Sequence, residues 1–168
     1  MKTLWAPWRM EHVLGAAPQI SGGLIEPPRG EPSDRAHLLL FRVALSVVLL
    51  NRFSYANGHL LLAPKRHLGD LTKLDAQGNL HFMTMLSACC TILRQRPHPH
   101  GINIAHNLGK TAGDGIIDHL HFHLVPRWKN DHNFMTVCAV IRTIPQHIDQ
   151  TVDLLLPDFL NLLTPPAP

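Results

Sequence analysis

The sequence predicts an α+β domain in which an antiparallel sheet packs against one long helix and a C-terminal helix. Short apolar, partly β-branched segments recur at 37–42, 43–52 and 59–65, with hairpin-length connections between them. One long stretch with helical apolar spacing follows, and two or three further strand-like segments come after it. Strands grouped around one helix with short connections are typical of this fold class.

The first three segments are expected to form neighbouring strands. Asn57-Gly58 is a turn signal before the third strand, and Pro64 is expected to end that strand. The long helix should begin after Asp75, whose carboxylate suits an N-cap, and should stop before Pro97. The apolar residues that recur at helical spacing within it are Leu80, Phe82, Met83, Leu86, Ala88, Cys89, Ile92 and Leu93.

The second half of the chain returns to strands. Residues 102–107 and 119–125 predict a fourth and a fifth strand, joined by a glycine-rich loop, and residues 137–144 favour a sixth. Residues 147–163 show helical spacing that we expect Pro157 to break.

Three regions follow from these patterns. Residues 1–36 are dense in turn signals and predict an irregular arm, in which Trp5 and Trp8 would dock on the body or on a partner subunit. Residues 37–148 form the predicted domain, and residues 149–168 the C-terminal helix and tail.

Composition excludes several classes of protein. The chain has 168 residues with 45% hydrophobic and 16% charged residues, which is globular. Its net charge of +3 is spread out and does not indicate a nucleic-acid partner. The longest apolar run, Val43 to Leu50, is far shorter than the about 20 residues that a membrane-spanning helix needs.

The cysteines and the N-terminus indicate a reducing compartment. Cys89 and Cys90 are adjacent, Cys138 is distant, and no Cys-x-x-Cys occurs, so neither a disulfide scaffold nor a cysteine-based zinc knuckle is expected. The first residues lack the continuous apolar stretch of a secretory signal. We therefore expect a cytoplasmic protein.

Histidine is strongly over-represented, with 13 residues, and three of them alternate along one predicted strand. Because side chains alternate faces along a strand, His119, His121 and His123 should share one wet, reactive face. The residues between them, Leu120, Phe122 and Leu124, should face the core.

Three interpretations of this face compete. A solvated polar face is one, although three imidazoles in a row suit it poorly. A metal site is the second, but His119 to His123 spans about 13 Å, so at most two of the three imidazoles could share an ion. The third is nucleophilic catalysis, in which one imidazole attacks phosphorus and its neighbours orient it or assist the leaving group.

Motifs along the chain resemble a known family. Residues 119–125 (HLHFHLV) fit the signature of the histidine triad (HIT) family of nucleotide hydrolases and transferases. The segments that resemble its bacterial branch, related to diadenosine tetraphosphate phosphorylases, are LWAPWRM at 4–10, NRFSYANGHLLLAPKRHLGDL at 51–71, NLGKTAGDGIIDHLHFHLVPRW at 107–128 and NDHNFMTV at 130–137.

The resemblance implies a fold, a dimer and a set of roles. The fold is a HIT-like five-stranded antiparallel sheet with helices. His121 would be the nucleophile on the α-phosphate, His123 would contact phosphate oxygens and assist the leaving group, and His119 would brace the site. The implied nucleotide-binding residues are Asn51 (ribose), His59 (phosphates), Asn107, Gly109, Asp114 and Gly115 (phosphate loop) and Trp128 (an aromatic near the substrate).

Two departures from the family pattern stand out. Many members of the branch bind a structural zinc through two cysteines, the equivalent of His67 and the first triad histidine, but here Gly23 and Glu26 occupy the cysteine positions. We expect the zinc to be lost, while Glu26, His67 and His119 leave a weak three-ligand site as the alternative. Asp114 is the second departure, because a carboxylate facing polyphosphate would repel it unless it points away or meets Lys110.

The sequence thus favours an enzyme that cleaves a phosphoanhydride bond through His121, on dinucleoside polyphosphates such as diadenosine tetraphosphate. Phosphate and water stay open as acceptors, and no resident cofactor is expected beyond a divalent metal carried with the substrate. The alternatives are a nucleotide-binding module with lost catalysis and a metal-binding protein. The apolar strand content exceeds what one helix covers, so a homodimer is expected.

Overall fold

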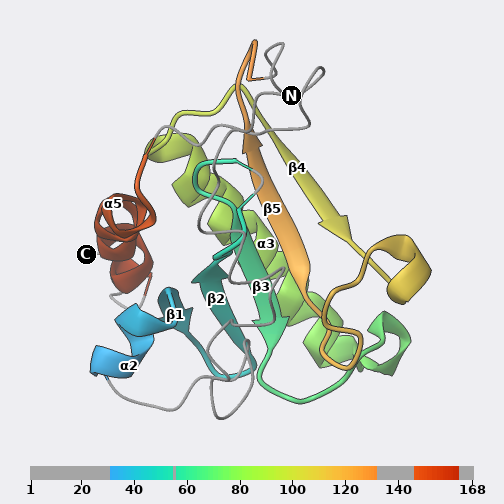
Figure 1. The fold of residues 1–168 in the computed structure, drawn as a ribbon. Coiled ribbons are helices and arrows are strands. Elements are labelled where there is room, and N and C mark those ends of the chain that lie inside the picture. Colours follow the sequence, from blue (N-terminus) through green and yellow to red (C-terminus); the bar gives the residue numbers. More distant parts are fainter. Residues whose placement is uncertain (1–30, 55, 132–145, 163–168) are drawn as a thin grey trace.

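The fold is an antiparallel sheet of five strands in the order β1-β2-β3-β5-β4, seen in a computed structural model that describes residues 31–54, 56–131 and 146–162. The strands are β1 (Leu39–Arg42), β2 (Ser46–Leu50), β3 (Leu60–Pro64), β4 (Gly101–His106) and β5 (Phe122–Arg127). The helices are α2 (Glu31–Ala36), α3 (Ala76–Gln95) and α5 (Ile148–Asn161), with short 3-10 turns at Leu71–Lys73 and Lys110–Ala112. The predicted α+β class and sheet are confirmed (Figure 1).

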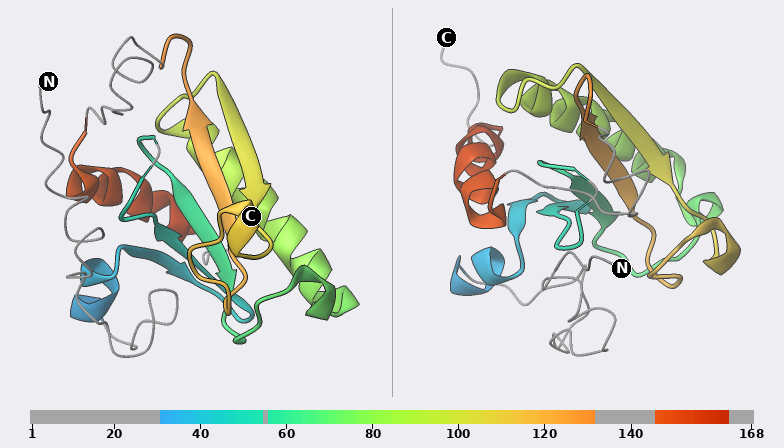
Figure 2. Two further views of the ribbon diagram at one scale, coloured as in Figure 1. Left: turned by 45° about the vertical axis from the view of Figure 1, so that its right-hand side comes forward. Right: turned by 45° about the horizontal axis from the view of Figure 1, so that its top comes forward.

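The long helix α3 crosses one face of the sheet, and α5 lies beside it near β1 (Figures 1 and 2). Asp75 caps α3, as the sequence predicts, and its carboxylate accepts the Gly78 N–H at 2.7 Å. The main core lies between this face and the two helices. A second, smaller cluster lies on the opposite face and is formed by Leu39, Val47, Leu49, Leu61 and Ala63, with Ile116 packed on it.

The C-terminal helix runs unbroken through Pro157, so the predicted break is wrong. Proline removes the hydrogen bond to the carbonyl of Asp153, but both residues lie on the exposed side, where water can satisfy that carbonyl. On the other side Val152, Leu155 and Phe159 are fully buried and hold the helix against the sheet.

The fifth strand begins at Phe122 and not at His119, because β3 cannot pair further. Pro64 ends β3 without an N–H to donate, and its carbonyl accepts the imidazole of His119 at 2.7 Å. The Leu120 N–H turns instead to the carbonyl of Leu68 at 2.6 Å. The polypeptide that carries the first two triad histidines therefore lies just past the end of the paired sheet.

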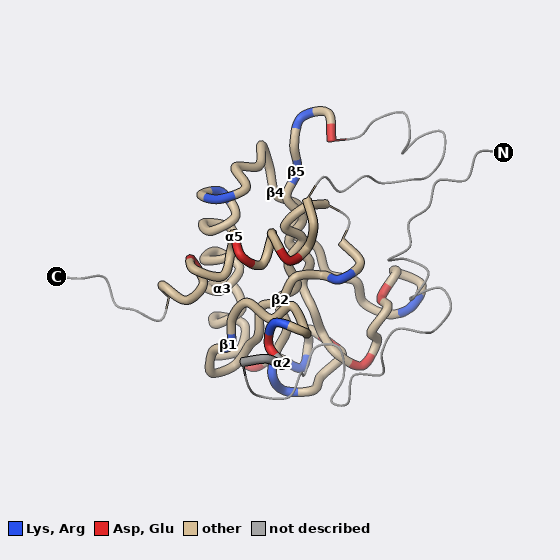
Figure 3. Tube along the Cα trace, turned by 60° about the vertical axis from the view of Figure 1, so that its left-hand side comes forward, with Lys and Arg blue, Asp and Glu red and all other residues tan. Residues whose placement is uncertain are grey.

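Several predictions concern other parts of the chain. The last residues of the predicted arm form the short helix α2. Trp5, Trp8 and the sixth strand predicted at 137–144 lie outside the described residues. No helix within the described residues is long and apolar enough to cross a membrane. Lys and Arg are spread over several elements of the described chain (Figure 3).

Candidate active site

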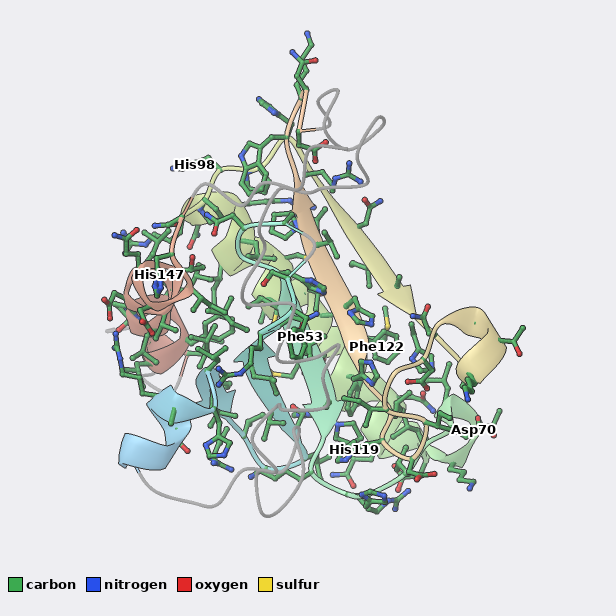
Figure 4. All side chains as sticks on the ribbon, viewed as in Figure 1. Phe53, Asp70, His98, His119, Phe122 and His147 are labelled. Atoms are coloured by element: carbon green, nitrogen blue, oxygen red, sulfur yellow. The ribbon has the colours of Figure 1, made fainter. Side chains whose placement is uncertain are left out.

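The imidazoles of His59, His119, His121 and His123 lie along β3 and the start of β5. His59 directly precedes the first residue of β3 and contacts His123, while His119 contacts the last residue of β3, Pro64. Figure 4 shows His119 near the end of β3 and Phe122 at the start of β5. The triad histidines are only 3%, 4% and 8% exposed, and His59 is completely buried. The expectation of a wet face is therefore wrong, since burial covers both sides of this segment. Burial favours the neutral form of an imidazole and strengthens its hydrogen bonds.

A directed chain of hydrogen bonds runs from Asn51 through His59 to His123. The Phe53 N–H donates to Oδ1 of Asn51 at 3.0 Å, which orients the amide so that its Nδ2 faces Nδ1 of His59 at 3.3 Å. An amide nitrogen can only donate, so His59 carries its proton on Nε2 and donates it to Nδ1 of His123 at 3.0 Å. In its neutral form His123 must then carry its own proton on Nε2.

Burial lowers the pKa of His123 from 6.5 to about 4. The positive charges that His121 and His106 can carry lower it further, while the carboxylate of Asp114 acts in the opposite direction. His123 is consequently neutral near pH 7. It presents an N–H donor at Nε2, which suits contact with a phosphate oxygen or a leaving group.

His121 is held in the tautomer that a nucleophile needs. Its Nδ1 lies 2.9 Å from the backbone carbonyl of His119, and because a carbonyl only accepts, the proton of neutral His121 sits on Nδ1. The lone pair is then on Nε2, which makes no hydrogen bond within the described part of the chain. The rings of His121 and His123 are 5.0 Å apart and nearly perpendicular. Nucleophile and donor are therefore side by side.

His119 braces the site through both its ring and its backbone. Its Nε2 donates to Pro64, and its carbonyl accepts from His121. Its ring meets that of His67 edge to face at 5.1 Å. Nε2 of His119 is therefore occupied by the carbonyl of Pro64.

A structural zinc of the kind found in relatives fits these residues poorly. Glycine at position 23 offers no side-chain ligand. Over residues 31–54, 56–131 and 146–162, no three histidine, cysteine or carboxylate side chains are arranged so that they could hold a metal ion. Gly23 and Glu26 lie outside those residues, so loss of the zinc stays a prediction.

The loop between β4 and β5 is shaped by its first residues. Gly109 has φ +82°, which glycine adopts without strain. The side chain of Asn107 donates to the carbonyl of Gly113 at 3.3 Å and closes the loop. Gly115 is exposed. The roles of Asn107, Gly109 and Gly115 in binding phosphate stay predictions.

Asp114 is buried in this loop, with 6% of its surface exposed.

Trp128 lies away from the imidazole cluster. Trp128 follows the far end of β5, about 23 Å along the strand from His121 at roughly 3.3 Å per residue. One chain alone does not bring Trp128 to the imidazoles. Its contact with substrate, like those of Asn51 with ribose and of His59 with phosphate, stays a prediction.

Sequence reasoning missed His106, the last residue of β4. Its Nδ1 donates to the backbone carbonyl of His121 at 3.0 Å, and its ring packs on Phe122 at 5.2 Å. Its Nε2 is buried and has no hydrogen-bond partner within the described residues. His106 thus holds the peptide of the predicted nucleophile where backbone pairing ends. Only the pairing of β4 with β5, which aligns His106 with Phe122, could have identified it.

The fold and site define a small α+β domain with a buried imidazole cluster along strands β3 and β5 of an antiparallel sheet. A family profile described as the HIT domain matches residues 34–130. The chain belongs to the HIT family, as its motifs predicted, and is a nucleotide enzyme of that family.

Relatives agree with this assignment. The chain is 33% identical to the AP-4-A phosphorylase of Mycobacterium tuberculosis over 161 residues, covering 92% of this chain and 83% of the relative. Its structure resembles that of a zinc-bound histidine triad family protein from Mycobacterium smegmatis, with TM-score 0.61, 26% identity and coverage of 74% and 85%. It also shares the fold of diadenosine triphosphate hydrolase from Plasmodium falciparum, with TM-score 0.59, 21% identity and coverage of 74% and 76%.

Proposed function

We propose that the protein cleaves a phosphoanhydride bond of dinucleoside polyphosphates, such as diadenosine tetraphosphate, through a covalent nucleotide on His121. The observation that carries this proposal is the hydrogen bond from Nδ1 of His121 to the carbonyl of His119, because it leaves the lone pair on Nε2. The likeness to a relative named AP-4-A phosphorylase supports the class of substrate.

The first step follows from the two tautomers. Nε2 of His121 attacks the α-phosphorus, a P–N bond forms, and the bridging P–O bond breaks on the opposite side. The leaving nucleotide departs as its phosphate anion and accepts a hydrogen bond from Nε2–H of His123, which keeps its proton. In the second step an acceptor oxygen displaces His121 and returns the lone pair to Nε2. The carbonyl of His119 holds the ring of His121, and the ring of His106 holds its backbone carbonyl, during both steps.

The test is turnover of diadenosine tetraphosphate, together with capture of the intermediate. Rapid acid-free quenching followed by mass spectrometry should find one nucleotidyl group on His121 in the wild type. His121→Ala should lose both the adduct and activity. His147→Asn is the matched control, because His147 is an exposed histidine at the start of α5 and asparagine can replace its capping contact. A protein that binds nucleotide without forming the adduct would instead be a binding module.

We also propose a homodimer, formed through β4 and the outer face of α3. β4 is an edge strand, and Ile104 on it is 49% exposed. No charged residue occurs between Ala76 and Leu93, although Leu80 and Met83 in this stretch are 71% and 62% exposed. The hydroxyls of Thr84, Ser87 and Thr91 bond back to carbonyls one turn earlier, so the outward face is effectively apolar.

Oligomeric state tests this surface. Sedimentation of the wild type should show twice the 18.8 kDa chain mass. Leu80→Glu combined with Met83→Glu should shift it to the monomer, because burying two carboxylates in an apolar contact is unfavourable. Leu160→Glu, at an exposed leucine of α5, should leave the mass unchanged. A wild-type monomer would refute the proposal.

A further inference from the structure

The mechanism above leaves one buried charged group unused, the carboxylate of Asp114. Its side chain is 6% exposed, and Oδ1 accepts the N–H of Ile116 at 2.9 Å. Within the described parts of the chain it forms no ion pair, and Lys110, the cation of the same loop, is exposed. A carboxylate kept out of water without a cation is unfavourable for folding, which points to a role in function.

The sheet register places this carboxylate on the imidazole side of the sheet. Ile116, whose N–H it accepts, packs on the cluster that contains Leu61. Leu61 is the direct register partner of His123 on β5, so the two side chains share that face. Asp114 is also close enough to His123 for its negative charge to raise the pKa of that histidine, against the larger effect of burial. In the proposed first step the leaving group departs beside His123, and in a double displacement the acceptor enters from that same side. The proximity of Asp114 to His123 therefore puts its charge on the acceptor side of the nucleotide.

We infer that Asp114 makes water, and not inorganic phosphate, the acceptor of the nucleotidyl group. This inference rests on the proposed function and decides between its two possible second steps. A carboxylate only accepts hydrogen bonds, which a water molecule can donate. A phosphate dianion at the same place would meet an unscreened like charge in a site of low dielectric. The polyphosphate substrate differs, since it arrives with a divalent cation that offsets its charge.

The second step then balances as a hydrolysis. The oxygen of water forms a bond to the α-phosphorus while the P–Nε2 bond to His121 breaks and its electron pair returns to Nε2. The proton of water passes to the Asp114 carboxylate and from there to solvent. The products from diadenosine tetraphosphate are AMP and ATP. Phosphorolysis would give ADP and ATP, so the two routes differ in one nucleotide.

The experiment is product analysis with the wild-type protein, diadenosine tetraphosphate, magnesium and millimolar inorganic phosphate in ¹⁸O-labelled water. We expect AMP that carries one ¹⁸O and almost no ADP. A wild type that yields mainly ADP overturns the inference but leaves the proposed function intact. A wild type that yields no product and no adduct on His121 refutes the proposed function itself.

Asp114→Asn tests the carboxylate directly. Asparagine keeps the oxygen that accepts the Ile116 N–H but removes the charge, so the ratio of ADP to AMP should rise about tenfold or more. Asp118→Asn is the matched control, because it removes an exposed carboxylate from the same loop and should not change the ratio. An unchanged ratio in Asp114→Asn overturns the inference.

A second measurement needs no variant. Methanol is a small neutral acceptor and fluoride a small anionic one, and both can compete with water for the nucleotide on His121. The wild type should form the methyl ester of AMP and no fluorophosphate adduct of AMP. Preference for the anion would contradict the role of Asp114 even if Asp114→Asn failed to fold.

Discussion

Nε2 of His59 lies 3.0 Å from Nδ1 of His123, and this contact decides which nitrogen of His123 carries a proton. The tautomer of His123 depends in turn on Asn51, whose amide is oriented by the backbone N–H of Phe53. The end of β2, two strands away from β5, therefore determines which ring nitrogens carry the protons. Three side chains act in series to place one proton.

Asn51→Asp should reverse the direction of the hydrogen bonds from residue 51 through His59 to His123, while the new side chain keeps the shape of asparagine. Aspartate accepts the Phe53 N–H as asparagine does, but it cannot donate to His59, so His59 would carry its proton on Nδ1 and His123 on Nδ1 in turn. We expect kcat to fall by about 10²-fold, in the range for loss of one hydrogen-bond donor to the developing charge, with a smaller change in KM. Nitrogen NMR of labelled histidines should report the switched tautomers. Wild-type tautomers in the variant would disprove the relay.

His106 offers a pair of substitutions that separate positioning from packing. His106→Asn retains a donor at the place of Nδ1 but loses the ring on Phe122, whereas His106→Phe retains the ring and loses the donor. If the bond to the His121 carbonyl positions the nucleophile, the Phe variant should lose about tenfold in kcat and the Asn variant should keep most of it. The opposite order would show that His106 only packs.

Acid should destabilise the fold through His123. The pKa of His123 is about 4 in the folded protein and 6.5 in the unfolded chain. Between these two pH values the unfolded chain therefore binds a proton at His123 and the folded protein does not. Stability is therefore lost as pH falls from about 6.5 to about 4, by up to about 3 kcal/mol from this residue. Urea unfolding of wild type and His123→Asn across this range isolates the effect. A difference between the two proteins that does not change with pH would contradict it.

Cys89 should be chemically inert in the folded protein. It is fully buried on α3, and burial raises the pKa of its thiol to about 12, with a smaller contribution from Cys90. Alkylation by iodoacetamide at pH 8 should be slower than in denaturant by on the order of a thousandfold, since the thiolate is the reactive form. Peptide-resolved mass spectrometry measures this site alone. Rapid labelling without denaturant would mean that α3 is not packed as described.

Local patterns were sufficient to predict much of the fold. The cap at Asp75, the hairpin strands and the alternation of histidines with Leu120 and Leu124 can all be recognised from spacing within a few residues. The family resemblance added the five-stranded sheet, which the structure confirms. These features depend on periodicity and capping, which a single sequence displays.

Features that depend on pairing between distant segments were not predictable. The late start of β5 follows from the carbonyl of Pro64, which is 55 residues from His119 in sequence. His106 reaches the carbonyl of His121 only because β4 and β5 pair in one register. The predicted break at Pro157 is wrong because the energetic cost of a proline inside a helix depends on whether the carbonyl that loses its hydrogen bond, here that of Asp153, faces solvent. That exposure depends on the tertiary structure.

The rings of His119, His121 and His106 all point their protons at main-chain oxygens, those of residues 64, 119 and 121. Peptide oxygens are present whatever amino acid occupies a position. Substitution of neighbouring side chains would therefore leave the hydrogen bonds of these three rings in place. The contact of His121 with residue 119 spans two residues, so an insertion or deletion elsewhere in the chain leaves it unchanged. The contacts of His119 with residue 64 and of His106 with residue 121 span 55 and 15 residues, so a change of chain length inside those intervals would have to be absorbed by a loop to keep the rings in place.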